Sequence, residues 1–306
     1  MINRREFLKK SGTAALGTML ASQLPIELFA KTMHPVGLGL FTLFNVLDDD
    51  VAGNLKKVAD LGYKEIESAF SKKGGFYGMK AKEFAALTKD LGLAWQSHHV
   101  IGAPIKLPPN FKMPVDASGK PMSIPPMKNL RDNHQELIDD AAEGGIKYIV
   151  CASTPIATLD EIKSSIEVLN KSAEVAKKAG LTFCYHNHDA EFKEVEGHIP
   201  YEMILAQTDA ANLKMELDLA WAVKGGYDPV ELFKKQPGRF PLWHVKDLTQ
   251  DRQVIKPVGE GTIDFKNIFA NAKVAGMQHF FVEHDMPADP FGSITSSMQN
   301  LKKLLS

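Results

Sequence analysis

Short apolar runs recur along the chain and alternate with stretches in which apolar residues follow helical spacing. Leu55, Val58 and Gly62, for example, lie three and four residues apart, which is typical of one face of an amphipathic helix. Helical stretches end near a glycine, which adopts the left-handed conformation after a helix at little cost. The apolar runs are nearly continuous, as expected for strands that are covered on both faces. Strands are predicted at residues 36–43, 63–68, 94–100, 148–153, 181–186, 213–219, 242–248 and 279–284.

These eight strands alternate with helices, a pattern that predicts a parallel sheet closing into a single (β/α)8 TIM barrel of the α/β class. The alternative is a doubly wound open sheet. That fold typically carries a glycine-rich phosphate loop after its first strand, whereas Gly37 and Gly39 lie inside the first predicted strand. We therefore predict one barrel domain over residues 31–306.

Residues 1–30 do not fit the strand-helix pattern. A twin arginine, Arg4-Arg5, precedes Phe7-Leu8, and the mild apolar stretch 12–21 is too short and too rich in Gly, Ala and Thr to span a bilayer. The segment resembles a bacterial twin-arginine export signal, which implies a periplasmic protein. Cleavage near Ala30 is expected, but Leu28 is a poor residue two positions earlier. An uncut segment that tethers the protein to the membrane is therefore left open.

Charge and cysteine content narrow the class of partner. The chain has 36 Lys and Arg against 37 Asp and Glu, so it lacks the basic footprint of a protein that binds nucleic acid or anionic lipid. Cys151 and Cys184 fall in predicted buried strands and define no disulfide framework. We expect a small-molecule partner, no nucleic acid and no membrane span, and leave a homodimer open.

One long loop interrupts the regular pattern. Residues 102–129 are rich in proline and follow the third predicted strand. Long loops in compact domains are often functional, and this one leaves the carboxyl end of a barrel strand, where active sites lie. We predict that it forms a lid.

Imidazole, carboxylate and amine side chains gather at the carboxyl ends of the predicted strands. In a barrel these ends converge on one bowl. Carboxylates and imidazoles directed at one point need a cation between them, or they must give up charge. Mixed nitrogen and oxygen ligands suit Mn²⁺, Zn²⁺, Co²⁺ or Fe²⁺ better than Mg²⁺ or Ca²⁺. The residues are Glu67, His98, His99, His186, His188, Asp218, His244, Lys246 and Glu283.

Six stretches occur in a characteristic order: Tyr63–Glu67, Ser97–Val100, Tyr185–His188, Leu217–Trp221, His244–Asp247 and Gly259–Phe265. With them, residues 35–306 resemble the xylose-isomerase-like barrel superfamily, in particular its sugar phosphate isomerase/epimerase branch. Its members include ketose 3-epimerases, inosose dehydratases, hydroxypyruvate isomerases and deglycosidases that act on 3-keto-glycosides. An endonuclease branch exists, but the near-neutral charge argues against it here.

The resemblance implies one divalent ion, with Mn²⁺ expected first and Zn²⁺, Co²⁺ or Fe²⁺ as alternatives. The family takes one ligand from each of strands five to eight, and the matching residues are His186, Asp218, His244 and Glu283. Two positions depart from the epimerase pattern. Epimerases have glutamate where His186 stands, and many relatives have a substrate-binding histidine where Trp221 stands. Both departures favour a reaction with one base and a separate acid, such as elimination or hydration.

The resemblance therefore implies an enzyme that acts on a sugar or keto-sugar, by default an isomerase or epimerase. The ion would polarise a carbonyl, Glu283 or His188 would take the neighbouring proton, and Lys246 or Glu67 would hold hydroxyls or protonate a leaving oxygen. His98, His99 and Trp221 are expected to bind substrate. Two alternatives are a lyase or hydratase acting on exported 3-keto-glycosides and a non-catalytic sugar-binding barrel.

Overall fold

The computed structural model of the protein describes residues 34–105 and 127–305. The predicted export signal, at residues 1–30, and most of the predicted lid, at residues 106–126, lie outside the described residues. Among the described ranges, no helix combines the length and the apolar character needed to cross a bilayer.

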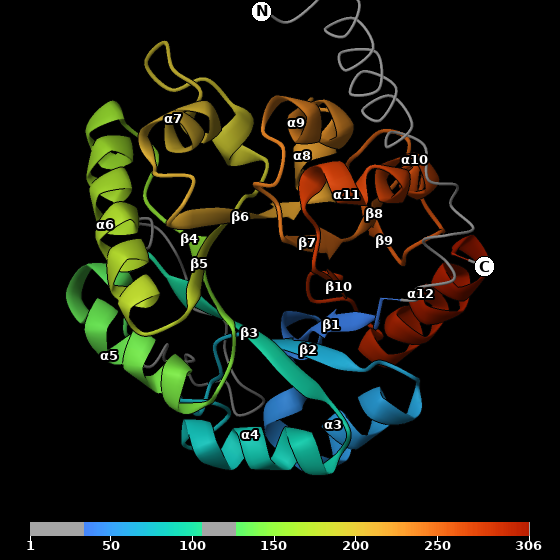
Figure 1. The fold of residues 1–306 in the computed structure, drawn as a ribbon. Helices are drawn as coiled ribbons and strands as arrows, with labels where there is room; N and C mark the ends of the chain where they lie inside the picture. The colour runs from blue at the N-terminus through green and yellow to red at the C-terminus, as the bar shows by residue number, and fades with distance from the viewer. Residues whose placement is uncertain (1–33, 106–126, 306) are drawn as a thin grey trace, which may run out of the picture.

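Eight parallel strands close into a barrel, in the order β1-β10-β7-β6-β5-β4-β3-β2 (Figure 1). The single TIM barrel predicted from the sequence is thus confirmed, and the open sheet is excluded. The bounds are β1 (Gly37–Gly39), β2 (Glu65–Ser68), β3 (Ala94–Ile101), β4 (Tyr148–Ser153), β5 (Thr182–His186), β6 (Leu213–Asp218), β7 (Leu242–Val245) and β10 (His279–Val282).

Helices surround the barrel on its outside (Figure 1). Their ends follow the local sequence: Thr158 caps a helix by accepting a hydrogen bond from the Glu161 amide at 3.2 Å. The α-helices are α3 (Val51–Asp60), α4 (Ala81–Asp90), α5 (Leu130–Glu143), α6 (Leu159–Lys178), α7 (Pro200–Gln207), α8 (Leu219–Lys224), α9 (Pro229–Lys235), α10 (Phe265–Ala270), α11 (Ala272–Ala275) and α12 (Pro290–Leu304). Short 3-10 helices are η1 (Leu40–Leu43), η2 (Leu47–Asp49) and η3 (Ala190–Phe192).

Two predicted strands are much shorter than expected, whereas the bounds of the others differ from the prediction by at most two residues. The run 36–43 forms a strand only over β1 and continues as η1, because a short apolar run fits a buried strand and a buried helical turn equally well. The run 242–248 divides into β7 and β8 (Asp247–Leu248). β8 pairs antiparallel with β9 (Ile255–Lys256) and so leaves the barrel wall.

An apolar floor closes the barrel interior below the polar residues. Tyr148, Val150, Cys184, Leu242 and Phe281 form a buried cluster separate from the main core. Side chains two residues apart on a strand point to the same face. The strands that supply the floor therefore carry their next inward-facing side chains toward the carboxyl-terminal mouth of the barrel.

Candidate active site and metal centre

The polar site lies directly above the apolar floor. Two residues beyond Cys184 and Leu242 come His186 and His244, and two residues beyond Phe281 comes Glu283. All three are less than 5 % exposed. Strand alternation thus explains how nearly continuous apolar runs end in a ring of inward-facing imidazoles and carboxylates.

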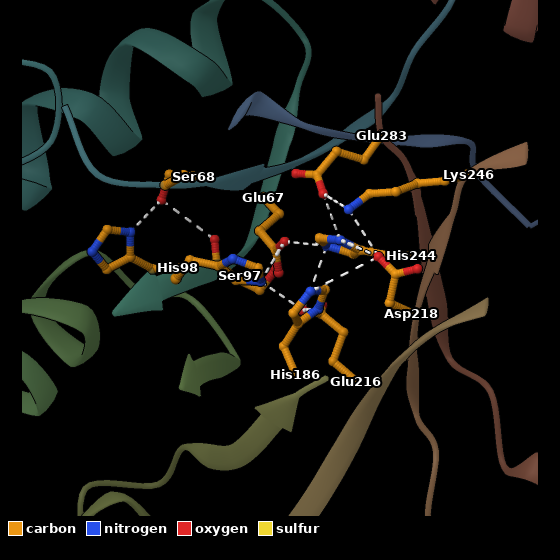
Figure 2. Close-up of polar contacts among 12 residues, drawn as sticks. Glu67, Ser68, Ser97, His98, His186, Glu216, Asp218, His244, Lys246 and Glu283 are labelled. Carbon is orange, nitrogen blue, oxygen red and sulfur yellow. Dashed lines mark hydrogen bonds and ion pairs between the residues drawn. The ribbon is translucent and has the colours of Figure 1, made fainter. Parts of the chain in front are cut away.

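An outer group is formed by Asp218, His244 and Glu283, three of the four ligands predicted from the sequence. Their ligand atoms lie within 4.8 Å of one another. Glu283 Oε2 is 2.9 Å from His244 Nδ1, and Asp218 Oδ2 is 3.9 Å from the same nitrogen (Figure 2). These three residues lie on β6, β7 and the end of β10, which are neighbours in the barrel.

Lys246 lies within this outer group and is 1 % exposed. Its Nζ is 2.8 Å from Asp218 Oδ2, 2.7 Å from Glu283 Oε2 and 2.8 Å from Asp285 Oδ1. Burial alone would lower the pKa of Lys246, but the three carboxylates outweigh it and raise this pKa well above its usual value. Burial raises the pKa of Glu283, yet His244 and Lys246 hold it well below its usual range. The amine is therefore protonated and the carboxylate ionised.

An inner group surrounds Glu216, which the sequence analysis did not single out. Its Oε2 is 2.6 Å from His99 Nε2, 3.2 Å from His186 Nδ1 and 3.4 Å from His244 Nε2. His186, the fourth predicted ligand, belongs to this group through Nδ1, and its Nε2 lies 3.8 Å from Asp218 Oδ2 of the outer group. Glu216 precedes Asp218 by two residues on β6, so strand alternation was the available indication that both side chains face inward.

Glu67 completes the inner layer from the opposite side of the barrel. Its Oε1 is 2.6 Å from His244 Nε2 and 2.9 Å from His99 Nε2, and its Oε2 accepts a 2.6 Å hydrogen bond from Ser97 Oγ. Burial alone would lower the pKa of His99, but Glu67 and Glu216 raise it to about 10. Burial and the nearby charge of Glu67 raise the pKa of Glu216 to about 7.

His188 and Trp221 flank the site. The His188 ring centroid is 5.0 Å from that of His186 and 6.1 Å from that of Trp221. The backbone amide of His188 donates to Glu191 Oε2 at 2.9 Å, and burial lowers the pKa of its imidazole. Lys246 Nζ lies 5.6 Å from the centre of the Trp221 ring. A substrate above the outer group would therefore have an imidazole, an indole and an ammonium within reach.

His98 stands apart from both groups, because adjacent residues on a strand point to opposite faces. Its Nδ1 is 2.8 Å from Ser68 Oγ, and its ring lies 4.8 Å from Phe76 (Figure 2 shows the Ser68 contact). His98 and its neighbour His99 both line a cleft beside β3, together with Phe70 and Phe76. Of the predicted substrate-binding histidines, only His99 contacts the central carboxylates.

The buried Glu216 Oε1 has no hydrogen-bond partner among the described residues. Asp218 Oδ2 and His244 Nδ1 do have charged partners, Lys246 Nζ at 2.8 Å and Glu283 Oε2 at 2.9 Å. Unsatisfied buried polar atoms are rare, and each one suggests a missing partner. Imidazole nitrogens with carboxylate oxygens form a donor set suited to a divalent transition metal, so these residues fit such an ion.

Comparison with known proteins assigns the chain to a family. The sequence profile of the xylose isomerase-like TIM barrel family matches residues 55–304. The chain belongs to this family. The crystal structure of a sugar phosphate isomerase/epimerase from Parabacteroides distasonis is similar to this chain, with 29 % identity and a TM-score of 0.72 over 89 % of this chain and 98 % of that one.

Curated relatives of this xylose isomerase-like barrel include dehydratases. The inosose dehydratase of Geobacillus kaustophilus is 28 % identical over 130 residues, which cover 37 % of this chain and 42 % of the relative. The chain spans about half the length of the curated relatives it matches. The crystal structure of the IolI protein with a bound zinc atom shares the fold, at 16 % identity and a TM-score of 0.64 over 89 % of this chain and 98 % of that one.

Proposed function

We propose that this xylose isomerase-like barrel is a metal-dependent enzyme that removes a proton next to the carbonyl group of a sugar or keto-sugar. Isomerisation, epimerisation and elimination beside a carbonyl can all begin with this step. The observation that carries the proposal is the convergence of Asp218, His244 and Glu283, whose ligand atoms lie within 4.8 Å of one another, beside a protonated Lys246. Such a group can hold a cation and stabilise negative charge developing on a substrate oxygen.

Asp218, His244 through Nδ1, and Glu283 are the residues we propose to hold the ion. A divalent ion bound there supplies a Lewis acid for the carbonyl and a neighbouring hydroxyl. Mn²⁺ is our first choice, and Zn²⁺, Co²⁺ and Fe²⁺ suit the same nitrogen and oxygen donors. Glu67 supports this arrangement, because its contact with His244 Nε2 at 2.6 Å fixes the ring so that Nδ1 faces the outer group.

His188 is the better of the two predicted bases. Glu283 Oε2 is already in contact with His244 and Lys246, which hold its pKa low and weaken it as a proton acceptor. Burial lowers the pKa of His188, so its imidazole is neutral near pH 7 and can accept a proton. Its ring also lies beside Trp221, at the edge of the group rather than within the ion-pair network.

Lys246 is proposed as the acid and oxygen-binding group. Its ammonium is held at 2.7–2.8 Å by three carboxylates, which keeps it protonated and fixes its direction. A substrate oxygen near this ammonium could receive a hydrogen bond or, in an elimination, a proton. The Trp221 indole, in contact with both Lys246 and His188, is proposed to form the wall against which the sugar ring lies. His98 and His99 are proposed to extend the binding surface along the cleft beside β3.

Isomerisation or epimerisation is our first candidate, since the Parabacteroides distasonis protein, 29 % identical and covered over 98 % of its length, is named a sugar phosphate isomerase/epimerase. Elimination or hydration, for example on a 3-keto-glycoside, is the second. It is favoured because, of the two predicted bases, Glu283 is held in ion pairs and His188 is the better proton acceptor. The inosose dehydratases among the curated relatives also favour it. A periplasmic location is proposed from the sequence of residues 1–30 alone.

An exchange experiment tests the proposal. The purified protein is incubated with Mn²⁺ in deuterated water with ketoses, inososes and 3-keto-glucosides in turn, and the products are followed by NMR. We expect deuterium at the carbon next to the carbonyl in one substrate class. An isomeric product would identify an isomerase or epimerase, and release of water or of an aglycone would identify a lyase.

The matched variants are His188→Gln and, as control, His198→Gln, which alters an exposed histidine outside the site. His188→Gln should reduce exchange by roughly 10²–10⁴-fold, the usual contribution of a general base, while His198→Gln should leave it unchanged. Sugar binding without exchange in any substrate class would show that the barrel binds sugars without chemistry, and the proposal would be wrong.

A further inference from the structure

We propose that the inner group is a second metal site, in which His99, His186 and Glu216 bind a divalent transition metal ion of their own. This inference goes beyond the reaction proposed above and does not depend on it. The outer group faces Nδ1 of His244, whereas the inner group faces Nε2 of the same ring. His244 thus lies between the two groups, and His186 also reaches both, since its Nε2 is 3.8 Å from Asp218 Oδ2 (Figure 2).

The inner group has the dimensions of a metal site. Glu216 Oε2 lies 2.6 Å from His99 Nε2, 3.2 Å from His186 Nδ1 and 3.4 Å from His244 Nε2, and all four ligand atoms lie within 4.8 Å of one another. Ligands around a tetrahedral ion with bonds of about 2.0–2.1 Å are about 3.3–3.4 Å apart. Only small side-chain movements would bring the donors to this spacing.

Hydrogen bonds alone would place three imidazole N–H groups against a single oxygen of the inner group. Three ring nitrogens face one oxygen of Glu216, and each would need its proton on that side. His244 would need protons on both nitrogens, because Nδ1 also faces Glu283 at 2.9 Å. A divalent ion removes this requirement, since it accepts the imidazole lone pairs directly.

The negative charges of the inner carboxylates also favour a bound cation. Glu67 and Glu216 are two fully buried carboxylates that share His99 and His244. In the described part of the chain, Lys246 makes its ion pairs with Asp218, Glu283 and Asp285 and none with either inner carboxylate. Buried charges are normally paired or coordinate metals, and the ion-pair partners of these two carboxylates among the described residues are imidazoles, which can also bind a divalent ion through their lone pairs.

A second, independent observation is the free oxygen of Glu216. The residue is 0 % exposed, and its Oε1 has no hydrogen-bond partner among the described residues. A carboxylate that binds an ion through one or both oxygens would satisfy this atom. Two imidazoles and one carboxylate from the protein are a known ligand set for transition metals, and they leave a position open for water or substrate.

Metal stoichiometry tests the inference directly. The metal-free protein is loaded with Zn²⁺, passed through a desalting column and analysed by native mass spectrometry and by elemental analysis. We expect two ions per chain. Glu216→Gln should remove one ion, Asp218→Asn should remove the other, and the double variant should bind none. The control is Glu65→Gln, which alters another buried glutamate that contacts a histidine and should keep both ions.

The outcomes separate this inference from the proposed function. A single ion that Asp218→Asn removes and Glu216→Gln retains would overturn the inner site and leave the proposed function standing. A single ion with the reverse dependence would support the inner site and overturn the outer ligand set. Binding of no ion at all would overturn both.

A second measurement decides the question if Glu216→Gln fails to fold. X-ray absorption at the zinc edge of the loaded natural protein counts imidazole ligands per ion. Two sites with these ligands predict about 1.5 imidazoles per zinc on average, whereas the outer site alone predicts about one. A value of one in a protein that holds a single zinc would overturn the inner site.

Discussion

Each end of β2 carries a buried glutamate that contacts histidine, but the two glutamates differ in how many partners they have. At the amino end, Glu65 Oε2 is 2.8 Å from His279 Nδ1, and its Oε1 accepts a 2.8 Å hydrogen bond from Gln96. Each of its two oxygens thus has one such partner, an imidazole for Oε2 and an amide for Oε1. Two residues later, Glu67 contacts two histidines, and one of these, His99, is shared with a second carboxylate.

The difference lies in how the contacts are shared, not in residue type. At the amino end of the barrel the glutamate is matched by one imidazole and one amide, which is a complete structural contact. At the carboxyl end, Glu67 and Glu216 share His99 and His244, and Glu216 Oε1 lacks a hydrogen bond from a described residue. An unsatisfied buried polar group costs about 1–3 kcal/mol. Shared imidazoles and an unsatisfied carboxylate oxygen at the mouth of a barrel are therefore consistent with a site that binds a cation.

The largest effect is expected from Lys246→Met, which removes the ammonium group from the carboxyl end. Asp218, Glu283 and Asp285 would lose the charge that each contacts at 2.7–2.8 Å, and substrate would lose its proposed acid. Turnover should fall by about 10²–10⁴-fold. Lys214→Met is the control, because the ammonium group of that lysine donates to the Gly238 carbonyl at 3.3 Å, outside the site. Equal turnover in both variants, measured with the substrate found by NMR, would remove Lys246 from the mechanism.

A smaller effect is expected from Glu67→Gln. The substitution preserves the shape of the side chain but removes the negative charge that fixes His244 through Nε2 at 2.6 Å. Loss of such a supporting contact typically reduces metal affinity or activity by about 10–100-fold. Titration with Mn²⁺ and turnover assays should both show the loss. Unchanged values would mean that His244 is held by its other contacts.

The smallest effect on turnover is expected from Glu65→Gln, the same substitution on the same strand two residues earlier. It weakens the contact with His279, and the free energy of unfolding should fall by about 1–2 kcal/mol. Turnover and metal content should stay within about twofold of the natural protein, since the apolar floor lies between this pair and the site. Thermal unfolding should show a decrease of roughly 2–8 °C. A loss of turnover without a loss of stability would contradict the proposed division between the two ends.

The barrel and most of its site followed from local sequence patterns. Apolar runs separated by helical spacing set the order of strands and helices. Because strand ends converge in a closed barrel, side chains at those ends could be assigned to one site. Asp218, His244, Lys246 and Glu283 meet as expected. The membership in the xylose isomerase-like family agrees with the motifs that suggested it.

Only the tertiary structure showed how these side chains are distributed between the inner and the outer group. Alternation along β3 predicts that His98 and His99 face opposite sides, but only the closed barrel shows that His99 faces the carboxylates. The sequence likewise could not indicate that His186 lies with Glu216, or that His244 directs one nitrogen to each group. Strand period is a local property of the backbone, whereas depth in the barrel and ring orientation depend on the register between strands distant in sequence.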